Sequence, residues 1–257
     1  MPKGEVILVG AGPGDPELLT LKAVRALERA DVVLFDSLVA PEILDFIQDS
    51  AQTFCVGKRG GRPSCKQDDI HDMMLRFACQ GKTVLRLKSG DPMIFGRAGE
   101  EISILERSGI AVTIIPGITA AMAAASSQKV SLTHRDYAQG VKFITAHSRK
   151  GELPDLDWGT CADDKTTLMV YMGARTAPKL AASLMSQGAS PDMPVMIAKG
   201  VSRESEDISY HRLADLLNLS INREQPVLLG IGYVFTERLA QFESPEIQDN
   251  VWAIAAT

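Results

Sequence analysis

The chain has 257 residues, 45% of them apolar, so it can bury a sizeable core as one large domain or two smaller ones. Its formal net charge of −5 argues against bulk nucleic-acid binding. No apolar run reaches the length of about 18 residues that a membrane span needs. The four cysteines show neither C-x-x-C spacing nor a companion histidine cluster, so we expect no metal site, no disulfide framework and a cytoplasmic location.

Short β-rich runs alternate with helical patterns along the chain, which indicates an α/β fold with mainly parallel or mixed sheets. The first strand is expected at residues 6–10. A helix is expected over 16–30, with Asp15 as its N-cap and Pro16 at its first position. Further strands are expected at 32–35, 53–56, 83–87, 111–115, 141–145, 166–172, 194–198 and 226–232.

A Pro-Gly turn within Pro116–Ala120 precedes a small-residue helical stretch and is the best internal break in the chain. We therefore predict two α/β domains, residues 1–117 and residues 118–257.

The loop after the first strand has the start of a dinucleotide fingerprint but not its end. In G-x-G-x-x-G the third glycine lets the helix pack closely on the strand, and here Asp15 takes that place. Pro13 and Pro16 also lack the N–H groups that a cofactor phosphate would need. Asp36 lies 24 residues beyond Gly12 (36 − 12), where such a fold holds the ribose, so an NAD-dependent oxidoreductase stays open as an alternative.

Polar residues follow several expected strands, at the sheet edge where open parallel sheets bind ligands. Asp36 directly follows 32–35, and Lys58 and Arg59 follow 53–56 between glycines. Arg97 ends the stretch SGDPMIFGR, and its planar fork suits carboxylates. A turn at Asp36 and solvated surface cations are the alternative interpretations of these positions.

Charge is unevenly distributed along the chain. Residues 55–150 hold 15 basic and 8 acidic side chains, and the rest of the chain holds 12 (27 − 15) and 24 (32 − 8), so the middle segment carries +7 against −12 elsewhere. A small polyanionic ligand is therefore plausible. The run His134-Arg135-Asp136 suggests a catalytic trio, but adjacent residues rarely converge on one atom, so we expect ion-pair and hydrogen-bond roles there.

Eight strings occur in a fixed order from residue 6 to about residue 200, and together they resemble the tetrapyrrole methylases. The strings are VGAGPGDPELLTLKA, ADVVLFDSLV, VGKRGG, GDPMIFGR, PGITAA, LTHRDYAQ, VYMGA and MPVMIAKG. The resemblance implies two α/β domains with a cofactor crevice between them, unlike the usual nucleotide-binding methyltransferase fold. It also implies a homodimer with a tetrapyrrole as its small-molecule substrate, and no nucleic-acid or membrane partner.

The resemblance implies S-adenosylmethionine as the methyl donor, S-adenosylhomocysteine as its product, and no metal. The implied reaction converts uroporphyrinogen III to precorrin-2 by two methylations, with precorrin-1 between them. A methylase of a later corrinoid precursor and a regulatory module that binds an anionic ligand without turnover are further alternatives.

The family's site positions carry over to this sequence by its matching motifs. The proton acceptor falls on Asp36, the proton donor on Lys58 and a functional arginine on Arg97, and Lys58, Arg59 and Arg97 would hold substrate carboxylates. The donor-binding positions are Pro13, Ser89, Gly90, Asp91, Ile94, Thr119, Ala120, Met172 and Gly200.

The sequence departs from the family pattern at two places. Ser89 stands where glycine is frequent, and Lys129-Val130-Ser131 stands where G-I-P precedes L-T-H-R-D, which could alter substrate fit. No dehydrogenase or ferrochelatase portion precedes residue 1, so we expect a stand-alone methyltransferase.

Overall fold

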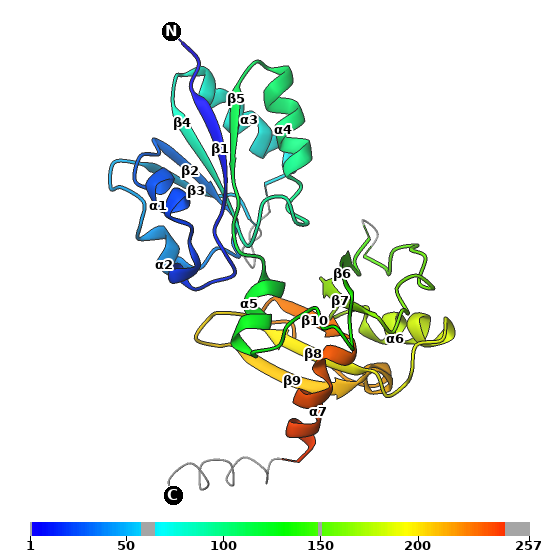
Figure 1. Cartoon of the computed structure of the whole chain (residues 1–257). Helices are drawn as coiled ribbons and strands as arrows, with labels where there is room; N and C mark the ends of the chain where they lie inside the picture. The colour runs from blue at the N-terminus through cyan, green and yellow to red at the C-terminus, as the bar shows by residue number, and fades with distance from the viewer. Residues whose placement is uncertain (1, 58–64, 149–150, 245–257) are drawn as a thin grey trace, which may run out of the picture. The chain divides into compact units, whose positions relative to one another are not determined.

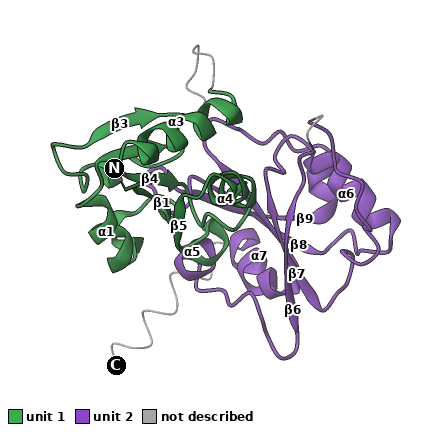
Figure 2. Cartoon of the chain, turned by 90° about the horizontal axis from the view of Figure 1, so that it is seen from above, with its two compact units in different colours: residues 1–123 green, residues 124–257 purple. Residues whose placement is uncertain are grey.

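The computed structural model describes residues 2–57, 65–148 and 151–244. The chain divides into two compact units, residues 1–123 and 124–257 (Figure 2). The predicted boundary after residue 117 lies six residues (123 − 117) before this division, and the assignment of two domains stays a prediction. Within the described residues each unit contains one five-stranded sheet, as the α/β pattern predicted.

The sheet of unit 1 is parallel throughout and has the order β3-β2-β4-β1-β5. The strands are β1 (Glu5–Gly10), β2 (Val32–Phe35), β3 (Gln52–Cys55), β4 (Thr83–Lys88) and β5 (Ala111–Ile115) (Figure 1). Its helices are α1 (Leu21–Leu27), α2 (Pro41–Leu44), α3 (Gln67–Cys79) and α4 (Ala98–Arg107).

Helices cover both faces of this sheet, so its strands β1, β2 and β4 are almost wholly buried. On one face Leu85 and Leu87 of β4 pack in a cluster with α1. Since successive side chains of a strand point to opposite faces, Val84, Arg86 and Lys88 lie on the other face, where α3 and α4 pack. Two charged side chains are therefore directed toward the helices rather than toward solvent.

The prediction of a single helix over residues 16–30 is wrong about where the α-helix begins. A 3-10 turn, η1 (Pro16–Leu18), comes first, and Asp15 caps that turn by accepting from Glu17 N at 2.8 Å. The α-helix begins at Leu21 because the Thr20 hydroxyl caps it, accepting from Ala23 N at 3.1 Å. Leu21, the first residue of this α-helix, is 75% exposed.

Unit 2 has a mixed sheet with the order β6-β7-β10-β8-β9. Only the β6–β7 pair is parallel among the described strands, and the other three pairs are antiparallel. The strands are β6 (Gly140–Thr145), β7 (Thr166–Tyr171), β8 (Pro194–Lys199), β9 (Asp207–Arg212) and β10 (Val227–Ile231). The sequence analysis did not predict β9.

Helices cover both faces of this sheet. The helix α6 (Ala177–Ser186) and the turn η2 (Leu213–Leu217) pack in one apolar cluster with Leu229 and Ile231. On the opposite face, the turn η3 (Tyr233–Phe235) places the Phe235 ring against Gly230, and α7 (Thr236–Glu243) follows. The small-residue helix α5 (Ala120–Ser127) spans the division between the units.

Three glycines meet where β1, β4 and β5 end. A Cβ added at Gly10 would lie 2.5 Å from Gly117 N and 2.7 Å from Gly90 O. These neighbours are backbone atoms and cannot rotate away, so the loops after the three strands pack closely only because Gly10 has no side chain.

We predict that Gly10→Ala lowers the free energy of unfolding by about 1–3 kcal/mol, because the added methyl overpacks fixed backbone. Urea denaturation measures the change. Gly99→Ala is the matched control, since Gly99 lies in α4 and an added Cβ there meets nothing within 4 Å. That change should stabilise the helix by about 0.5–1 kcal/mol. A Gly10 variant as stable as the original chain would contradict the close packing.

Candidate functional site

The carboxyl ends of all five strands of unit 1 lie at one edge of the sheet, because the strands are parallel. Pro13 follows β1, Asp36 follows β2, and the run Ser89-Gly90-Asp91 follows β4. The structure thus places these predicted site residues along the same edge. Lys58 and Arg59, predicted after β3, lie outside the described residues.

Hydrogen bonds join the loops after β1 and β4. Gly12 N donates to Gly90 O at 3.2 Å, and Gly90 N donates to Gly12 O at 2.7 Å, so the two loops form a short antiparallel bridge. Both glycines have positive φ, 70° and 69°, a conformation that favours glycine. Ala11 N adds a bond of 2.8 Å to Lys88 O.

The Asp91 carboxylate fastens a third loop to these two. Its Oδ1 accepts from Met93 N at 2.7 Å and its Oδ2 from Gly117 N at 2.9 Å. Thr119 Cα lies 3.9 Å from the position that a Cβ on Gly90 would occupy. Asp91 therefore organises the loops with both oxygens, and Gly90 and Thr119 are neighbours.

The β1 loop is not built as a dinucleotide phosphate cradle. The N–H groups of Ala11 and Gly12 are used within the fold, and Pro13 has none. Asp15 O and its side chain accept from Leu18 N and Glu17 N, which uses further donors inside the loop. Few backbone donors are left for a phosphate at the helix start.

Two residues with positive φ follow the β4 loop. Phe95 (φ 52°) and Arg97 (φ 56°) flank Gly96. A non-glycine residue in this region carries strain of order 1–3 kcal/mol, and such strain persists where surrounding contacts impose it, frequently at functional sites. Ile94, predicted to bind the donor, begins this segment, and its N–H donates to Asp91 O at 3.2 Å.

A cluster of buried charges lies beneath Asp36. Arg86 is 2% exposed, and its Nη2 donates to Asp36 Oδ1 at 2.5 Å while its Nε donates to Glu101 Oε1 at 3.3 Å. Arg86 Nη1 donates to the backbone oxygens of Leu87 at 3.1 Å and Leu34 at 3.4 Å. All three guanidinium nitrogens are thus engaged.

Glu101 is the centre of this cluster. It is fully buried, and Lys88 Nζ donates to both of its oxygens, at 3.0 and 3.2 Å. Burial lowers the pKa of Lys88, and the neighbouring charge of Arg86 lowers it further. Gln67 Nε2 also donates to Glu101 Oε1, at 3.1 Å.

Arg97 lies at the surface and its fork is already engaged. Its Nε and Nη2 donate to Glu100 at 2.9 and 2.6 Å, and its Nη1 donates to Gln67 Oε1 at 3.0 Å. The hydrogen bond to Glu100 raises the pKa of Arg97 above its ordinary value. The Arg97 side chain is 54% exposed, so this pair contributes little to stability and a ligand carboxylate could replace Glu100.

In unit 2, several predicted or cavity-lining residues lie at one edge of the sheet. The ends of β6 and β7 meet there because these strands are parallel, and β10 begins at the same edge because it is antiparallel to β7. A cavity of about 290 Å³ is found at this edge, and its lining includes His147, Met172, Ala174 and Gln225. Met172 has φ 57°, and a Cβ added at Gly200 would lie 3.2 Å from Gln225 Oε1. Of the two donor-binding residues predicted in unit 2, Met172 therefore lines this cavity together with Gln225, and Gly200 lies beside Gln225.

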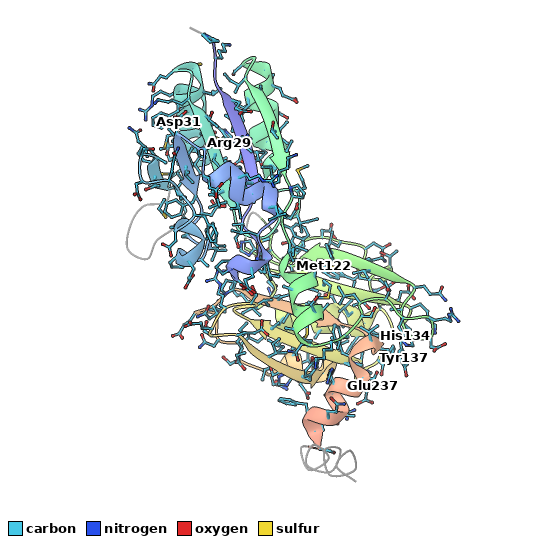
Figure 3. All side chains as sticks on the ribbon, turned by 60° about the vertical axis from the view of Figure 1, so that its left-hand side comes forward. Arg29, Asp31, Met122, His134, Tyr137 and Glu237 are labelled. Carbon is cyan, nitrogen blue, oxygen red and sulfur yellow. The ribbon has the colours of Figure 1, made fainter. Side chains whose placement is uncertain are left out.

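The His134-Arg135-Asp136 run forms a local turn. His134 Nδ1 accepts from Asp136 N at 3.1 Å, and the His134 and Tyr137 ring centroids are 4.7 Å apart. A cavity of about 170 Å³ beside them is lined in part by Lys129, Ser131 and Glu237; Figure 3 labels His134, Tyr137 and Glu237. The structural role predicted for this run agrees with these contacts.

The described residues contain no helix long and apolar enough to cross a membrane. In the same ranges, no three His, Cys, Asp or Glu side chains are grouped so that they could hold a metal ion.

The sequence analysis missed Arg86 and Glu101. A signal for both was present, because Arg86 and Lys88 alternate with Leu85 and Leu87 in an otherwise apolar strand. Glu101 likewise lies between Ala98 and Leu105 at helical spacing, on the buried face of α4.

Comparison with known proteins gives one family. Residues 5–217 match the model of the tetrapyrrole (corrin/porphyrin) methylases. The solved uroporphyrin-III C-methyl transferase of Thermus thermophilus, complexed with S-adenyl homocysteine, is 38% identical with a TM-score of 0.80, over 91% of this chain and 99% of that one. A solved cobalt precorrin-4 methyltransferase is 27% identical with a TM-score of 0.77, over 90% of this chain and 95% of that one.

A longer relative matches over part of its length. The siroheme synthase of Zymomonas mobilis is 46% identical over 232 residues, which are 90% of this chain and 49% of the relative. The chain thus spans about half the length of the curated relatives it matches.

Two adjacent glutamates of α4 give a matched test of the buried cluster. We predict that Glu101→Gln lowers the free energy of unfolding by about 3–5 kcal/mol, because it leaves Arg86 and Lys88 buried without their shared carboxylate. Glu100→Gln removes a partly exposed ion pair and should cost less than about 1 kcal/mol. Urea denaturation at pH 7 compares them, and equal losses would contradict the central place of Glu101.

Proposed function

Because the chain belongs to the tetrapyrrole methylase family, we propose that it transfers methyl groups from S-adenosylmethionine to ring carbons of uroporphyrinogen III. Two transfers would give precorrin-2 by way of precorrin-1. The similarity to the Thermus thermophilus enzyme, which extends over nearly the whole of both chains, carries this proposal.

The residues present fit a methyl donor of this kind. In unit 1, Pro13, Gly90 and Thr119 belong to loops that are fixed to one another by hydrogen bonds or close packing. In unit 2, the cavity beside Met172 has both apolar and polar lining. S-adenosylmethionine supplies an electrophilic methyl group on a sulfonium when it is bound. We propose that the predicted donor-binding residues hold it: Pro13, Ser89, Gly90, Asp91, Ile94, Thr119, Ala120, Met172 and Gly200.

The cations have the task of orienting the substrate. Uroporphyrinogen III carries a carboxylate on each of its side chains, and a planar guanidinium such as Arg97 can bind a carboxylate through two hydrogen bonds. Lys58 and Arg59 are proposed for the same role. Correct orientation of the attacking ring carbon is worth several orders of magnitude in rate.

We propose that Asp36 stabilises the positive charge that forms on the substrate during methyl transfer and then accepts a proton from it. Methyl transfer leaves positive charge on the macrocycle, and a nearby carboxylate stabilises it. The ring must then lose a proton, and the carboxylate can accept it directly or through a water. Asp36 is 30% exposed at the sheet edge, so it can reach a ligand there.

The finer statements about the protein are proposals as well. We propose a cytoplasmic homodimer composed of domains 1–117 and 118–257, which light scattering and limited proteolysis would examine. A later corrinoid precursor is the second candidate substrate, favoured by the similarity to cobalt precorrin-4 methyltransferase.

One incubation tests the function directly. The protein, mixed with uroporphyrinogen III and S-adenosylmethionine under anaerobic conditions, should release two equivalents of S-adenosylhomocysteine per macrocycle. After exposure to air, the product should show the absorbance of an oxidised dipyrrocorphin. Turnover of a later corrinoid precursor but not of uroporphyrinogen III would select the second candidate, and binding without any turnover would leave only a regulatory module.

The donor site in unit 2 has its own test. Ala174 lines the cavity beside Met172, so the larger ring of Ala174→Phe should obstruct it and weaken S-adenosylmethionine binding at least tenfold in calorimetry. Ala182→Phe is the control, because Ala182 is exposed on α6. NAD should give no binding heat with the unchanged protein. Unaltered affinity in the Ala174 variant would remove this cavity from the donor site.

A further inference from the structure

The buried charges of unit 1 balance only when Asp36 is included. Arg86, Lys88 and Glu101 are at most 4% exposed, and their formal charges sum to +1. Asp36 supplies the remaining negative charge through its bond to Arg86. A buried charge without a partner is strongly unfavourable. The buried cluster therefore favours the conformation in which the Asp36 carboxylate pairs with Arg86.

The contacts of Arg86 fix the direction of this bond. Its guanidinium is planar, and its Nε and Nη1 bond Glu101 and the backbone oxygens of Leu34 and Leu87. These acceptors belong to β2, β4 and α4, so they set the plane of the guanidinium. Nη2 then points to Asp36 Oδ1 from a direction that the fold determines.

One oxygen of Asp36 stays available to a ligand. Within the described ranges, Arg86 is the one side chain that donates to Asp36, and it does so at Oδ1. The backbone of Asp36 is fixed as well, since its N–H donates to Leu87 O at 3.2 Å and its carbonyl accepts from Val39 N at 3.0 Å. Oδ2 is therefore presented at the sheet edge by a side chain that cannot rotate freely.

We propose that Arg86 is a positioning residue for methyl transfer: it orients the Asp36 carboxylate, and Glu101 holds it in place for that task. This inference rests on the proposed function of Asp36. It adds a residue that touches neither substrate nor methyl donor and acts only through Asp36.

The test is a double-mutant cycle between Asp36 and Arg86, followed in turnover and in stability. Asp36→Asn leaves a net charge of +1 in the cluster, Arg86→Met leaves −1, and the double variant leaves zero. We expect each single variant to lose at least tenfold in kcat with KM for S-adenosylmethionine changed less than threefold. The double variant should be no slower than the slower single variant, since Arg86 has nothing left to orient.

Stability separates positioning from a merely structural role. Urea denaturation should show the neutral double variant to be at least as stable as either single variant. If misfolding caused the loss of turnover, the double variant would regain turnover along with stability. We expect it to regain stability only.

Lys88→Met is the matched control. Like Arg86→Met, it removes one buried cation from Glu101 and leaves −1 in the cluster, but it leaves the Arg86–Asp36 bond intact. Its kcat should fall less than threefold. Arg86→Lys covers the case in which Arg86→Met does not fold, because a lysine keeps the charge but cannot bond Glu101 and Asp36 in one plane. It should fold and still lose at least tenfold in kcat.

The outcomes distinguish this inference from the function on which it rests. A normal kcat in Arg86→Lys or Arg86→Met would overturn the positioning role of Arg86. So would a double variant whose loss in kcat equals the product of the two single losses. Neither result would contradict methyl transfer itself. Normal kcat in Asp36→Asn would overturn the roles of both residues and leave the activity intact. Absence of methyl transfer in the unchanged protein would overturn the proposed function and the positioning role together.

Discussion

The need to pair buried charges governs the architecture of unit 1. Arg86 and Lys88 are directed to the helix-covered face of the sheet by the two-residue period of β4, and neither can be solvated there. Glu101 is the buried carboxylate that compensates both, so α4 must pack with this residue facing the strand. The remaining positive charge is balanced at the sheet edge by Asp36, where the ligand chemistry is proposed.

Much of the fold could be predicted because it depends on local patterns. Apolar runs separated by helical segments located nine of the ten described strands. The strand β9 was missed because its sequence, DISYHR, has few apolar residues and resembles a loop. The first helix was placed too early because Asp15 and Pro16 are typical of a helix start, whereas Thr20 caps the α-helix one turn later.

The candidate site could be predicted only in part. Strand ends located Asp36, Gly90 and Asp91, because parallel strands bring their carboxyl ends to one edge whatever the side chains are. Sequence alone could not tell that Asp91 bonds backbone N–H groups with both oxygens, or that Glu100 engages Arg97. These contacts depend on loop geometry. The pairing of Arg86 with Glu101 depends in addition on the register between a helix and a strand.

The bridge between Gly12 and Gly90 has a consequence for the ligand binding that we propose for unit 1. It closes two loops, 78 residues apart in the chain (90 − 12), into a single rigid surface before any ligand arrives. Little conformational entropy is then lost when that surface is occupied, so more of the contact energy appears as affinity. A ligand bound by these loops would thus meet a preformed surface, and the loops would not need to close around it.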